Sequence, residues 1–138
     1  AEMSIEQISE VIAGAQTLFI IAGMGSGTGS GAAPVIARVA KEMGILTVGV
    51  VTKPAAGWET SKRMLNADVA LAELQPNVDL LIVLPLDTLF EMLGGENLTE
   101  DEFLAHVNEL MSSLVSIIVH AIPEFLLNNH RRSFLKSK

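Results

Sequence analysis

Three short apolar runs alternate with segments of helical periodicity, and this alternation limits the possible folds of the chain more than any other feature. The runs cover residues 17–22, 45–51 and 80–84, and Val, Ile and Leu dominate them. Continuous apolar runs of this length are typical of parallel strands that are buried on both faces. Strands that alternate with helices predict an α/β fold, here a small three-layer parallel sheet of about three strands with helices on both faces.

The first two helices have clear start and stop signals in the sequence. Ser4 and Gln7 form a capping-box pattern, which predicts a helix from the residue after Ser4 up to Gly14. Further along, Pro34 is expected in the first turn of a second helix, where its missing N–H costs little. Gly44 is the expected end of that helix.

The third helix is expected over residues 58–74, between the second and third strands. Helical spacing places five of its residues on one face, and four of them are apolar. The five are Met64, Leu65, Asp68, Leu71 and Ala72. Asp68 is the discordant member of a face that we otherwise expect to be buried.

Two further helices are expected after the third strand. Asp87 is the expected N-cap of a short helix that two glycines end. Thr99 and Glu102 form a second capping-box pattern, and the acidic residues after Thr99 favour a helix start. This last helix is expected to run to about Ala121 and to break at Pro123.

Composition and charge exclude several classes of protein. The net charge of −7 argues against general nucleic-acid binding, which needs a basic surface. No uninterrupted apolar run reaches about 18 residues, and the first residues lack the basic and apolar regions of a secretory signal. The absence of cysteine excludes disulfides and fits a reducing compartment, so we expect a cytoplasmic protein without a membrane span.

The length of 138 residues predicts one domain, followed by a short tail. We expect residues 1–122 to form the domain and residues 123–138 to form a helical or flexible basic tail. Residues 131–138 include four basic side chains, which could meet an acidic partner or a lipid surface. A solvated, frayed terminus is the simpler alternative.

Five glycines occur within the nine residues from Gly23 to Gly31, directly between the first apolar run and the second helix. The order of strand, glycine-rich turn and helix exposes backbone N–H groups next to the positive end of a helix dipole. Glycines also let a phosphate approach the main chain without a side chain in the way. Ligands of open parallel sheets bind beyond the carboxyl ends of the strands, so this turn is the best candidate for an anion site. Met24 is expected to pack beneath it.

Two well-known phosphate motifs do not match the glycine-rich stretch. No Lys follows the glycines, so the stretch is not a Walker A loop. The Gly-x-Gly-x-x-Gly motif of dinucleotide-binding proteins can be aligned with the stretch only loosely. No acidic residue follows the second apolar run to hold a ribose. A purely structural turn before a helix is the alternative that the residues alone leave open.

Together with its flanks, the stretch is more specific. The segment from Gly23 to Pro34 resembles the signature loop of the tubulin/FtsZ family, and residues 36–54 resemble the helix and strand that follow it in FtsZ. The resemblance spans residues 5–122 and continues through Lys62-Arg63-Met64 and residues 78–85. It implies the second half of a Rossmann-like, guanine-nucleotide-binding domain from a self-assembling cell-division GTPase of the cytoskeleton.

The resemblance also implies which residues contact a nucleotide, namely GTP or GDP, with or without Mg²⁺. By analogy, one loop holds the α- and β-phosphates, and Glu59 and Arg63 match family positions near the ribose and phosphates. Asn108 matches the position that contacts the guanine ring. Glu59 and Arg63 are four residues apart and could instead form a surface helix pair, and Asn108 could be a solvated helix residue. The loop residues are Gly25, Ser26, Gly27, Thr28, Gly29, Ser30 and Gly31.

Several departures from the family pattern bear on binding and hydrolysis. Leu86 stands where FtsZ has Asn after the Pro of the third strand, which removes one expected contact to guanine. Ser26 replaces a middle glycine, and residues 55–58 replace a more Phe-rich turn. The acidic Asn-x-Asp-x-x-Asp loop of the family is not found over residues 123–130. The first strands of the family, with their phosphate loops, would precede this stretch, so GTP hydrolysis stays open.

Two functions fit these observations. The first is nucleotide binding by a self-assembling domain, and the second is a structural or interaction module that keeps the fold without hydrolysis. A three-stranded sheet has two edges that need cover, so we expect a homo-oligomer or a complementary segment. We propose no catalytic residues, and His106, His120 and His130 are too scattered in the sequence for a metal site.

Overall fold

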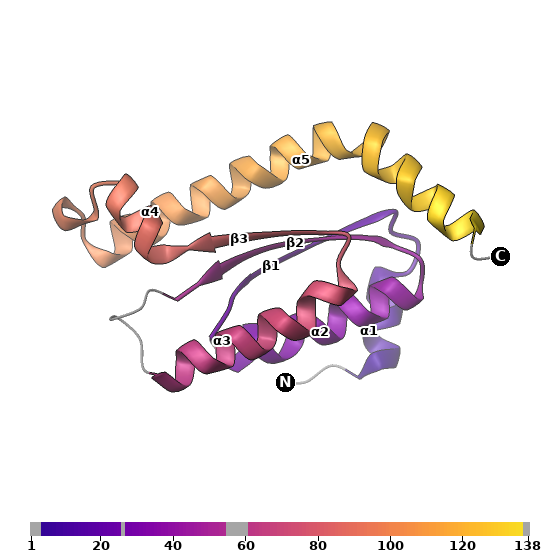
Figure 1. Ribbon diagram of the computed structural model, residues 1–138, viewed down its shortest axis with the longest axis horizontal. Coiled ribbons are helices and arrows are strands. Elements are labelled where there is room, and N and C mark those ends of the chain that lie inside the picture. The colour runs from indigo at the N-terminus through magenta and orange to yellow at the C-terminus, as the bar shows by residue number, and fades with distance from the viewer. Residues whose placement is uncertain (1–3, 26, 55–60, 137–138) are drawn as a thin grey trace. The chain divides into compact units, whose positions relative to one another are not determined.

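The computed structural model describes residues 4–25, 27–54 and 61–136, and for residues 27–30, 61 and 122–136 it describes the main chain alone. The chain divides into two compact units, Ala1–Asn97 and Leu98–Lys138, and each is described by itself. Figure 1 shows the elements of both units as ribbons. The first unit contains the sheet and the glycine-rich turn, so it positions most of the predicted site.

The first unit is built on a parallel sheet, as the alternating apolar runs predict. Its strands follow one another in space in the order β1-β2-β3. β1 and β2 are in register up to Gly23 opposite Thr52, and β2 and β3 are in register up to Lys53 opposite Pro85. The carboxyl ends of all three strands therefore meet at one edge of the sheet. The strands are β1 (Thr17–Gly23), β2 (Leu46–Lys53) and β3 (Leu80–Pro85).

Helices connect the strands and lie on one side of the sheet. Two right-handed crossovers between strands in the order β1-β2-β3 place both connecting helices on the same face. Figure 1 shows α1, α2 and α3 on that side of the sheet. The three helices are α1 (Ile5–Ile12), α2 (Gly27–Glu42) and α3 (Ser61–Leu74). The predicted α/β fold on a small parallel sheet is confirmed.

The core of the first unit lies between the sheet and the helices α2 and α3. Val51 of β2 and Leu74 of α3 are fully buried there, together with Ala37 and Ala67 from the two helices. Alanine at these positions lets each helix approach the strands closely. Met24 belongs to the same cluster and is 4% exposed, which confirms that it packs beneath the glycine-rich turn.

The buried face of α3 agrees with the predicted one at Leu71, which packs against the core, but differs at other positions. Ala67, Ala70 and Leu74 face the core, whereas Leu65 is 63% exposed. Asp68, which was expected on the buried face, lies at the surface. The prediction followed the large apolar side chains, but two of the three buried positions of α3 are alanines, which let the helix lie close to α2 and the sheet.

Both predicted capping boxes are present. The hydroxyl of Ser4 accepts the N–H of Gln7 at 3.1 Å, and the Gln7 side chain accepts the N–H of Ser4 at 2.9 Å. The hydroxyl of Thr99 accepts the N–H of Glu102 at 3.1 Å, and the Glu102 carboxylate accepts the N–H of Thr99 at 3.3 Å. These pairs fix the starts of α1 and of α5 (Glu100–Lys136).

Two other helix starts differ from the prediction. α2 already begins at Gly27, so Pro34 lies inside the helix rather than in its first turn. The glycine-rich segment is thus helical despite its low helix propensity. α4 (Leu86–Met92) begins directly after Pro85, and Asp87 lies in its first turn instead of capping it. The Asp87 carboxylate accepts the N–H of Thr88 at 2.8 Å.

The second unit consists mainly of α5. The helix continues through Pro123 to Lys136, so the predicted break at Pro123 is wrong. A proline inside a helix removes one hydrogen bond and bends the helix without ending it, and α5 bends in Figure 1. Its segment Glu100–Ala121 contains 18 residues with a mean hydropathy of 1.3, and by length and composition it could span a membrane. Core helices of soluble proteins pass the same test, so this feature supports a span only weakly.

Candidate functional site

The glycine-rich turn is attached to the end of β2. The N–H of Met24 donates to the carbonyl of Thr52 at 2.9 Å, one residue beyond the last residue of β1. Gly23, the residue before it, lies opposite Thr52 in the sheet. The turn therefore starts from a fixed point at the carboxyl edge of the sheet, where ligands of parallel α/β proteins bind.

Gly25 occupies a position that only glycine fits. Its φ of +96° is unfavourable for any residue with a Cβ. A Cβ at this position would lie 2.9 Å from Cγ of Pro54 and 3.3 Å from the carbonyl oxygen of Arg63. The main chain of the turn is thus held between the end of β2 and the first turn of α3. This contact brings together two of the predicted site residues, Gly25 and Arg63.

The second half of the predicted loop forms the start of α2. The N–H groups of the first three residues of an α-helix have no acceptor within the helix, and here they belong to Gly27, Thr28 and Gly29. Together with the helix dipole, such groups attract an anion. Gly31 is the fifth residue of α2, so the helical pattern directs its N–H to the carbonyl of Gly27.

An ion pair that the sequence did not predict lies next to the turn. Nζ of Lys53 is 3.1 Å from Oδ1 of Asp68, and the two side chains are 37% and 56% exposed. Lys53 is the last residue of β2 and Asp68 belongs to α3, so the pair joins the two elements that contact Gly25. Its signal in the sequence was the acidic residue on the predicted apolar face of α3.

The structure gives less information about the other predicted site residues. Arg63 is exposed near the start of α3, and Asn108 is exposed on α5 in the second unit. Ser26 and Glu59 lie outside the described residues, as does Trp58. The nucleotide contacts of all these residues stay predictions.

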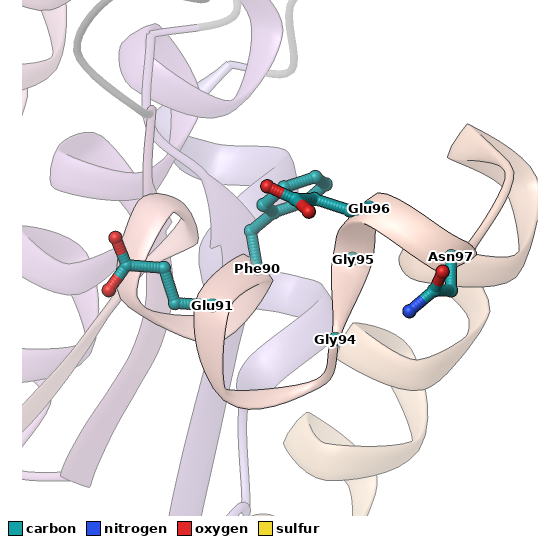
Figure 2. Close-up of a pocket in the computed structure, with 6 residues that line it drawn as sticks. All are labelled: Phe90, Glu91, Gly94, Gly95, Glu96 and Asn97. Carbon is teal, nitrogen blue, oxygen red and sulfur yellow. The ribbon is translucent and has the colours of Figure 1, made fainter.

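A separate hollow lies at the end of α4, and Figure 2 shows the six residues around it. Its cavity volume is about 360 Å³, within the range of small-ligand sites. Two of its lining residues, Glu91 and Glu96, are acidic, which disfavours a phosphate. The other four are Phe90, Gly94, Gly95 and Asn97. Within the described part of the chain, no three His, Asp or Glu side chains are grouped to hold a metal ion.

The opposite edge of the sheet is held by hydrogen bonds within the protein. The Asp79 carboxylate accepts the N–H of Thr47 at 2.7 Å, and the N–H of Asp79 donates to the Thr47 carbonyl at 2.8 Å. The buried Thr47 hydroxyl donates to the carbonyl of Ile45 at 3.0 Å. Lys41 donates to the carbonyl of Pro76 at 2.8 Å. These polar groups tie neighbouring segments together, so their role is structural.

The fold and the turn define an α/β protein with a glycine-rich connection between the first strand of a parallel sheet and the following helix. The profile described as "Tubulin/FtsZ family, GTPase domain" matches residues 1–94. The chain therefore belongs to the tubulin/FtsZ family, and the resemblance seen in the sequence is confirmed.

Individual relatives agree with the family match. Cell division protein FtsZ of Bartonella bacilliformis is 45% identical over 128 residues, which are 93% of this chain and 22% of that protein. The FtsZ of Rickettsia felis is 50% identical over 103 residues, 75% of this chain and 23% of that protein. A solved empty dimer of FtsZ from M. jannaschii has a TM-score of 0.76 and 36% identity over 86% of this chain and 34% of its own. The chain thus spans between a fifth and about a third of the length of these relatives.

Proposed function

We propose that this chain binds GTP or GDP as part of a self-assembling FtsZ-like domain, with the phosphates on the loop from Gly25 to Gly31. The conformation of Gly25 carries the proposal. Its positive φ, and the short distances from a Cβ at this position to Pro54 and the Arg63 carbonyl, constrain the main chain two residues before the start of α2. A turn fixed in this way is preorganised for an anion, which lowers the entropic cost of binding.

The remaining contacts follow from the family positions. Glu59 and Arg63 would meet the ribose and phosphates, and Asn108 would meet the guanine ring. Binding would take place in the cytoplasm, with or without Mg²⁺ as counter-ion. Residues 1–122 would form the nucleotide-binding domain, and residues 123–138 would form the basic tail.

Self-assembly is the second part of the proposal. β1 and β3 are the outer strands of the sheet, and Ile21 of β1 is 53% exposed. Open edges and exposed apolar residues favour pairing with another chain or with a complementary segment. Size-exclusion chromatography with light scattering tests the homo-oligomer, and a stable monomer at micromolar concentration argues against it.

A non-catalytic structural or interaction module is the alternative, and Leu86 favours it. Leu86 begins α4 directly at the carboxyl end of β3, where the family has Asn. A leucine offers no hydrogen bond to a base, so it weakens the preference for guanine. GTP hydrolysis is a further claim, because it needs a group that orients the attacking water.

Titration with GTP, GDP and ATP, with and without magnesium, tests the proposal. Binding is followed by calorimetry and by the fluorescence of Trp58, the single tryptophan. Saturable binding of GTP or GDP supports the site on the glycine-rich turn. No binding at millimolar nucleotide rejects the proposal in favour of the alternative. Binding without preference for guanine supports the consequence drawn from Leu86.

A further inference from the structure

Lys53 lies beside the glycine-rich turn, and the proposed nucleotide contacts give it no role. Its two sequence neighbours both contact the turn. The carbonyl of Thr52 accepts the N–H of Met24 at 2.9 Å, and Cγ of Pro54 would lie 2.9 Å from a Cβ at Gly25. The main chain of Lys53 is therefore adjacent to the proposed phosphate site.

The side chain of Lys53 points toward α3. Alternate residues of a strand lie on the same face, and Val51 packs in the core cluster with Ala67 of α3. Lys53 shares the face of Val51, and its ammonium meets Asp68, the residue after Ala67, at 3.1 Å. A pair of opposite charges thus joins the end of β2 to this part of the surface of α3.

This ion pair is suited to exchange. Both side chains are partly exposed, and solvent-exposed ion pairs hold their partners weakly. A phosphate group provides more charge and several acceptor oxygens, so its bonds to an ammonium are stronger. The four-carbon stem of lysine is flexible enough to change partners without moving the main chain.

We infer that Lys53 is a side-chain ligand of the phosphate groups of a nucleoside di- or triphosphate bound at the glycine-rich turn. Asp68 is then a positioning residue, which holds the ammonium when no ligand is bound and competes with the phosphate for it. The inference rests on the proposed function and adds a charged ligand to a site otherwise made of backbone N–H groups. It predicts opposite effects for the loss of the two partners.

The experiment measures GDP affinity of the full chain by calorimetry. Lys53→Gln is expected to weaken binding about tenfold, the loss of one charge-assisted hydrogen bond. Asp68→Asn is expected to strengthen binding about threefold, because the competing carboxylate is gone. The double variant is expected to bind like Lys53→Gln, since Asp68 acts through Lys53. Lys53→Arg keeps the charge and should retain affinity within about threefold.

Two variants control for the overall change in charge. Lys41→Gln removes one positive charge at the opposite edge of the sheet, and Glu73→Gln removes one negative charge at the far end of α3. Both should leave GDP affinity within about twofold, because solvent screens distant charges. Side-chain NMR tests whether Lys53 meets the ligand. The Lys53 signals should shift when GDP is added to the wild type, whereas a purely structural role predicts no such shift.

The outcomes separate the two proposals. If the wild type does not bind GDP, the proposed function is rejected and the role of Lys53 falls with it. If the wild type binds and Lys53→Gln behaves like Lys41→Gln, the role of Lys53 alone is overturned. Thermal unfolding by circular dichroism shows whether each variant is folded, and Lys53→Arg preserves the test if Lys53→Gln is not.

Discussion

The first unit contains two glycine turns with opposite chemistry. The turn at Gly25 lies beside the cationic Lys53 and leads into the positive end of a long helix. The turn at Gly94 and Gly95 borders a hollow with two carboxylates, those of Glu91 and Glu96. The second turn borders the hollow, whereas the chemistry of a phosphate favours the first. Charge and main-chain direction therefore make the first turn the proposed phosphate site.

The two turns also need glycine for different reasons. Gly25 has a positive φ and lies against a proline ring and a carbonyl oxygen. Gly95 is buried, and a Cβ there would overlap the ring of Phe90. The first glycine lets the main chain approach another segment, and the second leaves room for one side chain. Substitutions by alanine can tell these roles apart.

The largest expected effect is the loss of binding in the double variant Gly27→Ala/Gly29→Ala. Both residues lie in the first turn of α2, where added methyl groups would keep a phosphate from the backbone N–H groups. Two lost hydrogen bonds to a charged ligand correspond to a loss of about 100-fold or more in affinity. Calorimetry with GDP measures it.

Stability provides the control for this double variant. Alanine is a better helix former than glycine, so the urea concentration at which the double variant unfolds should not fall below that of the wild type. Unchanged GDP affinity in a folded double variant would place the phosphate away from the start of α2 and would remove the functional difference between the two turns.

Gly25→Ala is expected to cause the largest loss of stability. The strained φ and the overlap with Pro54 add up to about 2–4 kcal/mol in the free energy of unfolding. Gly14→Ala is the matched control, because Gly14 has a φ of +83° but no atom within 4 Å of an added Cβ. Gly14→Ala should lower the free energy of unfolding only by the cost of the positive φ, about 1–2 kcal/mol. Equal losses in urea unfolding would show that the contact with Pro54 does not matter.

Gly95→Ala is expected to destabilise the chain by about 1–3 kcal/mol through overpacking against Phe90. GDP affinity should stay unchanged, because the proposed anion site is the turn at Gly25. Phe90→Ala in the same chain makes room for the added methyl group, so Gly95→Ala should cost much less in that background. Additive losses of the two substitutions in urea unfolding would contradict the packing role of Gly95.

The sequence predicted those features that depend on local patterns. The three strands follow from apolar runs, and the capping boxes at Ser4 and Thr99 follow from residue types at fixed spacing. The start of α2, the buried face of α3 and the Lys53–Asp68 pair depend on packing between distant segments. The start of α2 was placed too late because Pro34 was expected in its first turn, whereas the helix already begins at Gly27.

The candidate site was predictable to a similar extent. Its glycines and its place after β1 were evident from the order of strand, turn and helix. The close packing of Gly25 against Pro54 and the Arg63 carbonyl was not evident from the sequence. It depends on strand order and register, which bring distant segments together. The hollow near Phe90 had no signal in the sequence beyond two adjacent glycines.

Gly31→Ala has the smallest expected effect and is the sharpest test of where the anion site ends. Gly31 is helical, and an added Cβ would meet no atom within 4 Å. Alanine should therefore stabilise the chain by about 0.5–1 kcal/mol in urea unfolding. The N–H of Gly31 is directed to the Gly27 carbonyl, so GDP affinity should fall much less than in Gly27→Ala/Gly29→Ala. An equal fall in affinity would mean that the phosphate lies along the side of α2 as far as Gly31, rather than at the first N–H groups of the helix.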